Sequence, residues 1–250
     1  MRIVHGSFQK GARESGWEIA NILRSLWQIF HDVPARKDFS LITGTDVFPL
    51  QFCQHRWVED IKVAERALEI WPHVDKYVKT VTMEGKAPTS TSFFTVSSAC
   101  DDVLIQSKLE FCVSVAKPTQ ESLVKFQNEA PMAPYLGPSS KALLMNTMGR
   151  FLKSEVLEKA DKFKKLSSID PADNKNDKHL KQVGLGFAVR DTLKKVTEKK
   201  AASELCILSF KNDCVKFLSA IASKLLEICP LKYPLVLLTC LSRQHTSTKL

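Results

Sequence analysis

Residues 48–60, FPLQFCQHRWVED, join a polar connection to a long helical pattern and contain most of the chemically distinctive side chains of this chain. Before this stretch, Gly44 lies among polar residues, so we expect an irregular connection over 35–47 and a short strand over 48–52. After it, apolar residues recur at every third or fourth position, which predicts a helix with an inner face of Trp57, Ile61, Ala64, Leu68 and Trp71. The stretch marks the boundary between two kinds of predicted structure.

Helical periodicity covers most of the remaining chain. Residues 1–4 are expected to end a strand, followed by a turn and a short helix. The other predicted helices span residues 17–30, 56–84 with a kink at Pro72, 91–117, 120–127, 140–156, 187–200 and 201–228. The very polar segment near 170–183 predicts an exposed loop. These patterns predict a mainly α-helical protein.

Composition sets broad limits on function. With 250 residues and 44% hydrophobic content, the chain can bury a core. Its formal net charge of +9 favours polyanionic partners, although lysine-rich solvated faces explain it equally well because the excess looks dispersed. Seven cysteines form no CxxC pair, and no apolar run approaches the roughly 18 residues of a membrane span. We therefore expect an intracellular, soluble protein without a membrane partner.

Two short patterns could carry metal or nucleophilic chemistry. Cys53 and His55 lie two residues apart, as a zinc half-site or a Cys-His dyad requires, but no second ligand pair stands at a usual spacing. The acidic pairs Glu59-Asp60 and Asp101-Asp102 point about 100° apart on a helix, so neither forms a two-metal site unaided. We expect no metal, no cofactor and a packed cysteine beside a surface histidine.

Arg56 and Trp57 form the more informative pair. A guanidinium group can hold a phosphate while an indole ring stacks on an unpaired base, which is the chemistry of nucleic-acid binding. Alternatively, Trp57 is only the first apolar residue of the following helix. The residues alone favour this second interpretation.

Several motifs together resemble hAT-superfamily transposase-like proteins. They are HGSFQ at 5–9, the stretch at 48–60, FQNEAPMAPYL at 126–136 and CPLKYPLV at 229–236. The resemblance extends from residue 1 to about residue 236. In that family a large helical insertion interrupts an RNase H-like catalytic core.

The resemblance implies a role for three residues. Arg56-Trp57 matches the Arg-Trp pair that marks the passage from core to insertion, and it implies that Trp57 stacks on distorted DNA. His5 stands where the family's Cys-x-x-His histidine falls, although Arg2 replaces the cysteine. Residues 1–55 would then be a truncated RNase H-like α/β remnant, and residues 56–250 an all-helical insertion-type domain.

The same resemblance implies that this chain is not an enzyme. The family's metal-binding aspartates precede the His5 region and its glutamate follows the insertion, so none of them has a counterpart here. We therefore predict no catalytic residues and a transposon-derived, nuclear, DNA-binding protein. One alternative is a helical scaffold that binds a protein partner or itself, because loss of the core would uncover Trp17, Trp27 and Phe30. Another is a decayed or incomplete fragment of a larger protein.

Overall fold

A computed structural model describes residues 2–53, 56–58, 60–125, 133–160 and 163–228 of the chain. Every regular element in these residues is a helix, and an isolated bridge between Leu152 and Asp177 is their only β-type pairing. The α-helices are α1 (Arg2–Ser15), α2 (Ile19–Ile29), α3 (Val33–Thr43), α4 (Ile61–Met83), α5 (Thr91–Asp101), α6 (Ile105–Lys125), α7 (Ala133–Gly149), α8 (Ser154–Glu158), α9 (Phe163–Leu166), α10 (Phe187–Glu198) and α11 (Glu204–Ile228). The 3-10 helices η2 (Asn174–Asn176) and η3 (Leu180–Gln182) precede α10. The prediction of a mainly α-helical protein is confirmed.

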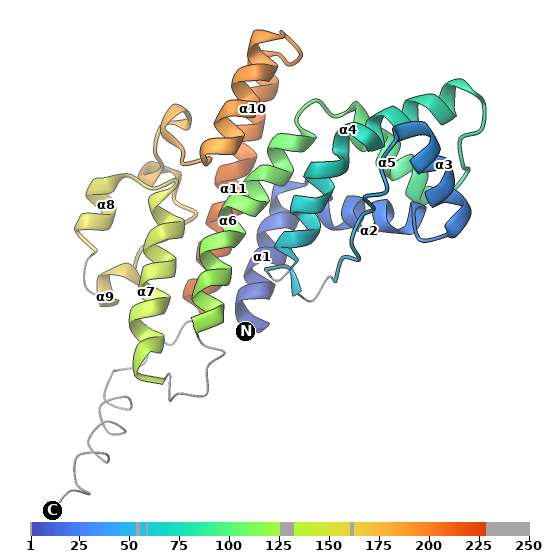
Figure 1. The fold of residues 1–250 in the computed structure, drawn as a ribbon. Helices are drawn as coiled ribbons and strands as arrows, with labels where there is room; N and C mark the ends of the chain where they lie inside the picture. Colours follow the sequence, from blue (N-terminus) through green and yellow to red (C-terminus); the bar gives the residue numbers. More distant parts are fainter. Residues whose placement is uncertain (1, 54–55, 59, 126–132, 161–162, 229–250) are drawn as a thin grey trace, which may run out of the picture.

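The helices are arranged around three long central ones. In Figure 1, α2, α3 and α5 gather at one end and α7, α8 and α9 at the other, while α1, α6 and α11 lie between them. Helix α1 packs against α11, and α6 packs against both α4 and α10. The first and last described helices are therefore neighbours.

A cluster of aromatic side chains forms the centre of this arrangement. The ring of Trp17 stacks on Phe210 with centroids 5.4 Å apart, and its edge packs against Phe111 at 5.7 Å. Phe217 contacts Phe8 at 5.6 Å and Phe111 at 5.5 Å. Such pairs stabilise a core beyond the area they bury. The start, middle and end of the chain share this core.

The expected exposure of apolar residues near the N-terminus is corrected by this packing. Trp17 and Phe30 are only 5% and 1% exposed, because α11 covers the first and Tyr77 of α4 contacts the second. Trp27 alone stays partly exposed, with its ring 4.6 Å from His31. Trp17 and Phe30 therefore offer no apolar surface to a partner.

The α/β remnant expected over residues 1–55 is not seen in the part of this segment that the structure describes. Helix α1 is present where a strand end and a turn were predicted. Gly11 lies where α1 crosses α11 closely, so this glycine serves helix packing and does not mark a turn. Helix α3 replaces the predicted irregular connection; Pro34 is tolerated in its first turn, and Gly44 ends it at φ 76°. Residues 48–53 run without pairing to any described strand.

Several helix boundaries also differ from the predictions. The helix expected over 140–156 is replaced by α7, which starts earlier and ends at Gly149, and by the separate short helix α8. The helix expected over 91–117 is broken after α5, where Asp102 accepts a hydrogen bond from the backbone N–H of Leu104 at 2.9 Å and pairs with Lys108 at 2.6 Å. Pro118 does not end α6, which continues to Lys125. In the polar segment near 170–183, about half of the residues are exposed, and the segment contains η2 and η3.

Candidate nucleic-acid interface

The residues around Arg56 form a tight turn that leads into α4. The backbone N–H of Cys53 donates to Asp60 Oδ2 at 2.8 Å, and the N–H of Asp60 donates to the carbonyl oxygen of Arg56 at 3.0 Å. A third bond joins the N–H of Arg56 to the Cys53 carbonyl oxygen at 2.9 Å. These bonds fix the direction in which residues 56–58 present their side chains. His55, the partner proposed for Cys53, lies outside the described residues.

His5 reaches this turn from α1. Its side chain is 7% exposed, and Nδ1 accepts a hydrogen bond from the backbone N–H of Val58 at 3.3 Å. In this arrangement Nδ1 is the acceptor nitrogen of the ring and carries no proton. The structure therefore brings together the three positions that the family resemblance singled out, although they are about fifty residues apart in the sequence.

Trp57 points into the protein, whereas Arg56 is exposed. The indole of Trp57 is 6% exposed and meets Phe52 edge to face at 5.1 Å. A cavity of about 10 Å³ lies beside it, bounded also by Phe8 and Ile61. Ligand pockets usually measure roughly 300 Å³ or more, so no base fits against this ring in the folded protein. The arginine and the tryptophan thus do not share a surface.

The indole nitrogen of Trp57 has an unusual environment. Nε1 is fully buried, and no hydrogen-bond partner lies near it among the described residues. A buried donor without a partner costs free energy, so the position is held by apolar packing alone. This packing supports the interpretation of Trp57 as the first apolar residue of the helix face that includes Ile61 and Ala64, both buried.

Metal and thiol chemistry find no support in the described part of the chain. There, no three His, Cys, Asp or Glu side chains gather closely enough to hold a metal ion. Burial raises the pKa of Cys112 to about 12, which keeps its thiol protonated and unreactive. Burial also raises the pKa of Cys100 to about 12, with nearby Asp75 and Asp101 adding to the effect.

The positive charge of the chain is not dispersed, which corrects the interpretation from composition. Residues 1–125 contain fifteen basic and fifteen acidic side chains, whereas residues 126–250 contain twenty-one basic and twelve acidic ones. The whole net charge of +9 therefore belongs to the second half. Counting charges by segment would have detected this signal in the sequence.

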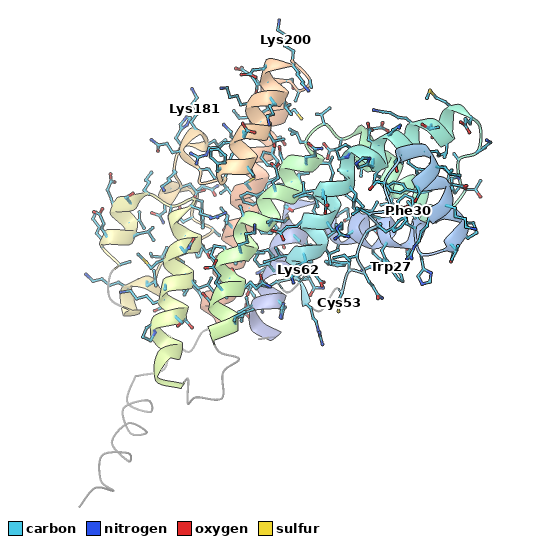
Figure 2. All side chains as sticks on the ribbon, in the orientation of Figure 1. Trp27, Phe30, Cys53, Lys62, Lys181 and Lys200 are labelled. Atoms are coloured by element: carbon cyan, nitrogen blue, oxygen red, sulfur yellow. The ribbon has the colours of Figure 1, made fainter. Side chains whose placement is uncertain are left out.

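Much of this charge lies exposed on and beside α10. We call this region the α10 surface and define it as Lys181, Arg190, Lys194, Lys195, Lys199 and Lys200, all of which are exposed. Figure 2 shows Lys181 and Lys200 at one end of the molecule, far from Cys53 and Lys62, which flank the Arg56 turn in the sequence. The structure thus separates the α10 surface from the predicted Arg56-Trp57 site.

The two acidic residues of α10 are both engaged within the helix. Asp191 pairs with Lys195 at 2.6 Å, and Glu198 lies 3.8 Å from Lys194. The hydrogen bond and charge of Asp191 raise the pKa of Lys195, so this lysine remains charged at neutral pH. The remaining cations of the α10 surface therefore face solvent with little local compensation.

No family model, no curated protein and no solved structure matches this chain. The resemblance to hAT transposases therefore depends on the quoted motifs, and it stays a prediction. Among the described residues, no helix is both long and apolar enough to cross a lipid bilayer.

Proposed function

We propose that this chain is a non-catalytic, transposon-derived protein that binds nucleic acid in the nucleus. The observation that carries the proposal is the concentration of the whole +9 charge in residues 126–250, with six exposed cations on the α10 surface. Clustered lysine and arginine side chains bind phosphates and release counterions, which supplies most of the affinity in sequence-independent binding. The α10 surface supplies the main contact, and Arg56 a second one.

The family resemblance adds a finer element to this proposal. The helices after Arg56 correspond to the family's insertion domain, whereas the described part of residues 1–55 is helical and shows no α/β remnant. The hydrogen bond between His5 and Val58 supports this correspondence, because it joins the family-motif histidine to the Arg56-Trp57 turn. The proposal includes no strand cleavage, since no metal-holding acids of the family can be assigned here.

Charge reversal tests the proposal. We expect the double variant Lys199→Glu, Lys200→Glu to bind a labelled oligonucleotide about tenfold more weakly or worse, because two phosphate contacts become repulsive. The matched control is Lys37→Glu, Lys76→Glu, which changes the net charge equally but alters exposed lysines of α3 and α4. Fluorescence anisotropy measures the affinities of both variants.

The outcomes separate the two candidate surfaces. Equal losses in both double variants would show that only net charge matters and would contradict the role of the α10 surface. Arg56→Ala, measured alongside, is expected to weaken binding by a smaller factor of about two to three. No binding by the unmodified protein would exclude the proposed function.

A second candidate function is protein interaction through α3. Leu41 and Val33 are 83% and 64% exposed and line a groove of about 600 Å³ with Phe48, whose ring lies 5.2 Å from the Arg36 guanidinium. Exposed apolar side chains beside a groove are typical of protein-binding surfaces. If the function is self-association through this groove, Leu41→Asp will convert an oligomer to a monomer in light scattering.

A further inference from the structure

An exposed phenylalanine begins α10. Phe187 is 82% exposed, whereas Val189 and Leu193 of the same helix are buried and connect it to the core. A single exposed apolar side chain is ordinary on a protein surface, so its neighbours decide what it can do.

The exposed face of α10 that begins at Phe187 carries charges of both signs, with cations in excess. At 100° per residue, Phe187 shares this face with Arg190 and Lys194. The face also holds two acids, Asp191, which pairs with Lys195, and Glu198, which lies 3.8 Å from Lys194. Arg190 Nε donates to the carbonyl oxygen of Gly186 at 3.2 Å, which holds the guanidinium toward the end of α10 where Phe187 lies. Lys181 is exposed in η3, six residues before Phe187 in the sequence. An aromatic ring thus lies on a surface whose cations outnumber its acids.

This combination favours one class of partner. A single-stranded nucleic acid offers both a base face for the ring and phosphates for the cations. A duplex offers phosphates but keeps its base faces stacked inside, and an acidic peptide offers charge without flat base faces. The positive charge around Phe187 therefore complements a single strand best.

We infer that Phe187 stacks on an unpaired base while Arg190 and Lys194 hold the adjacent phosphates, an inference that rests on the proposed function. The α10 surface therefore prefers single-stranded to double-stranded nucleic acid. The preference comes from the ring, and the charge supplies affinity for both forms.

Substitution of the ring tests this inference on the full chain. The probes are a labelled single strand of about 16 nucleotides and the duplex of the same sequence, compared by anisotropy. We expect Phe187→Ala to weaken single-strand binding by roughly 5- to 150-fold, because loss of one stacked base costs about 1–3 kcal/mol. Duplex binding should change by less than about twofold, and Phe187→Tyr should retain the preference.

A matched control and the thermal melt exclude a general effect. Phe94→Ala removes another exposed phenylalanine, 59% exposed on α5 in the half of the chain with no net charge, and should leave both affinities unchanged. Unaltered melting by circular dichroism shows that Phe187→Ala folds. Equal affinity of Phe187→Ala and the unmodified protein for the single strand would overturn the inference and leave the proposed function intact. If the unmodified protein binds neither probe, the proposed function fails first.

Discussion

At the scale of single residues, burial separates the members of the Arg56-Trp57 pair. Arg56 is exposed, whereas the indole of Trp57 is 6% exposed against Phe52. A side chain that fills the core can influence binding only through the fold. The proposed contact of Arg56 with nucleic acid and the packing of Trp57 in the core therefore need separate tests.

Trp57→Ala is expected to lower the free energy of unfolding by about 3–5 kcal/mol, because it leaves a large cavity between α1 and α4. Urea denaturation followed by circular dichroism measures this change. Trp27→Ala is the matched control and should cost less, since its ring is partly exposed. A Trp57→Ala protein that unfolds normally yet no longer binds oligonucleotide would restore the stacking role of Trp57.

Glu110 places an acidic group at the contact between α6 and α10. Oε1 accepts a hydrogen bond from Thr192 at 2.8 Å, while Oε2 is buried without a partner among the described residues. Burial raises the pKa of Glu110 above its ordinary 4.5, and nearby Asp191 raises it further, against the opposing effects of the Thr192 bond and Lys195. The folded protein therefore binds this proton more tightly than the unfolded chain does.

Because the pKa of Glu110 is higher in the folded protein than in the unfolded chain, the free energy of unfolding should fall as the pH rises from about 4.5 through this raised pKa. Glu110→Gln should remove that part of the fall, while the part from Asp177, whose pKa burial also raises, remains. Thr192→Val should deepen the fall, because it removes a hydrogen bond to the charged carboxylate. Urea titrations at several pH values measure the effect, and a parallel pH dependence in all three proteins would contradict it.

At the scale of elements, the crossing of α1 and α11 decides how the N-terminal segment folds. A Cβ atom at Gly11 would lie 2.8 Å from Ile221 Cγ1 and 2.9 Å from the Phe217 carbonyl oxygen. Helices approach this closely only where one side contributes no side chain. The glycine that suggests a turn in the sequence therefore serves helix packing.

Gly11→Ala should destabilise the protein by about 1–3 kcal/mol, because the backbone oxygen of Phe217 cannot move aside easily. Gly6→Ala is the internal control: it lies in the same helix, and a Cβ there meets nothing within 4 Å. That substitution should stabilise the helix by up to about 1 kcal/mol. Thermal melts of the two variants should shift in opposite directions; a shift in the same direction would refute the crossing argument.

Two further glycines permit a close approach before α10. Gly184 donates its N–H to the Arg150 carbonyl oxygen at 2.7 Å, and a Cβ there would lie 3.2 Å from Arg150 Cα. Gly186 adopts φ 96° against Ser114, whose hydroxyl accepts a bond from Arg150 Nη1 at 3.0 Å. These contacts fix the start of α10 and hence the position of Phe187.

At the scale of the whole molecule, the main feature is the unequal net charge of the two halves of the sequence. The first half, which has no net charge, supplies α1–α6, and the positive second half supplies α7–α11 with the α10 surface. A field of one sign over one end of a protein attracts polyanions and orients them before contact.

Binding of a single strand should therefore weaken steeply between about 50 and 200 mM salt, as counterion release requires. The double variant Lys199→Glu, Lys200→Glu should reduce the slope of log affinity against log salt by roughly 0.7 for each lost phosphate contact. Anisotropy titrations at four or more salt concentrations give the slope. An affinity that does not change with salt would contradict an electrostatic interface.

The sequence by itself determined the helical class, most helix positions and the total charge. Periodic apolar residues predict α2, α4, α10 and α11 because one buried face is a local property of a helix. Charge by segment was also readable from the sequence. None of these depends on which helices become neighbours.

Only the tertiary structure decided what is exposed. Burial of Trp57, the helical state of residues 2–15 and the contact of His5 with Val58 all follow from long-range packing. A glycine or a tryptophan has the same local pattern whether it faces a neighbouring helix or water, because the difference lies in residues distant along the chain. For that reason the candidate interface moved from Trp57 to the α10 surface.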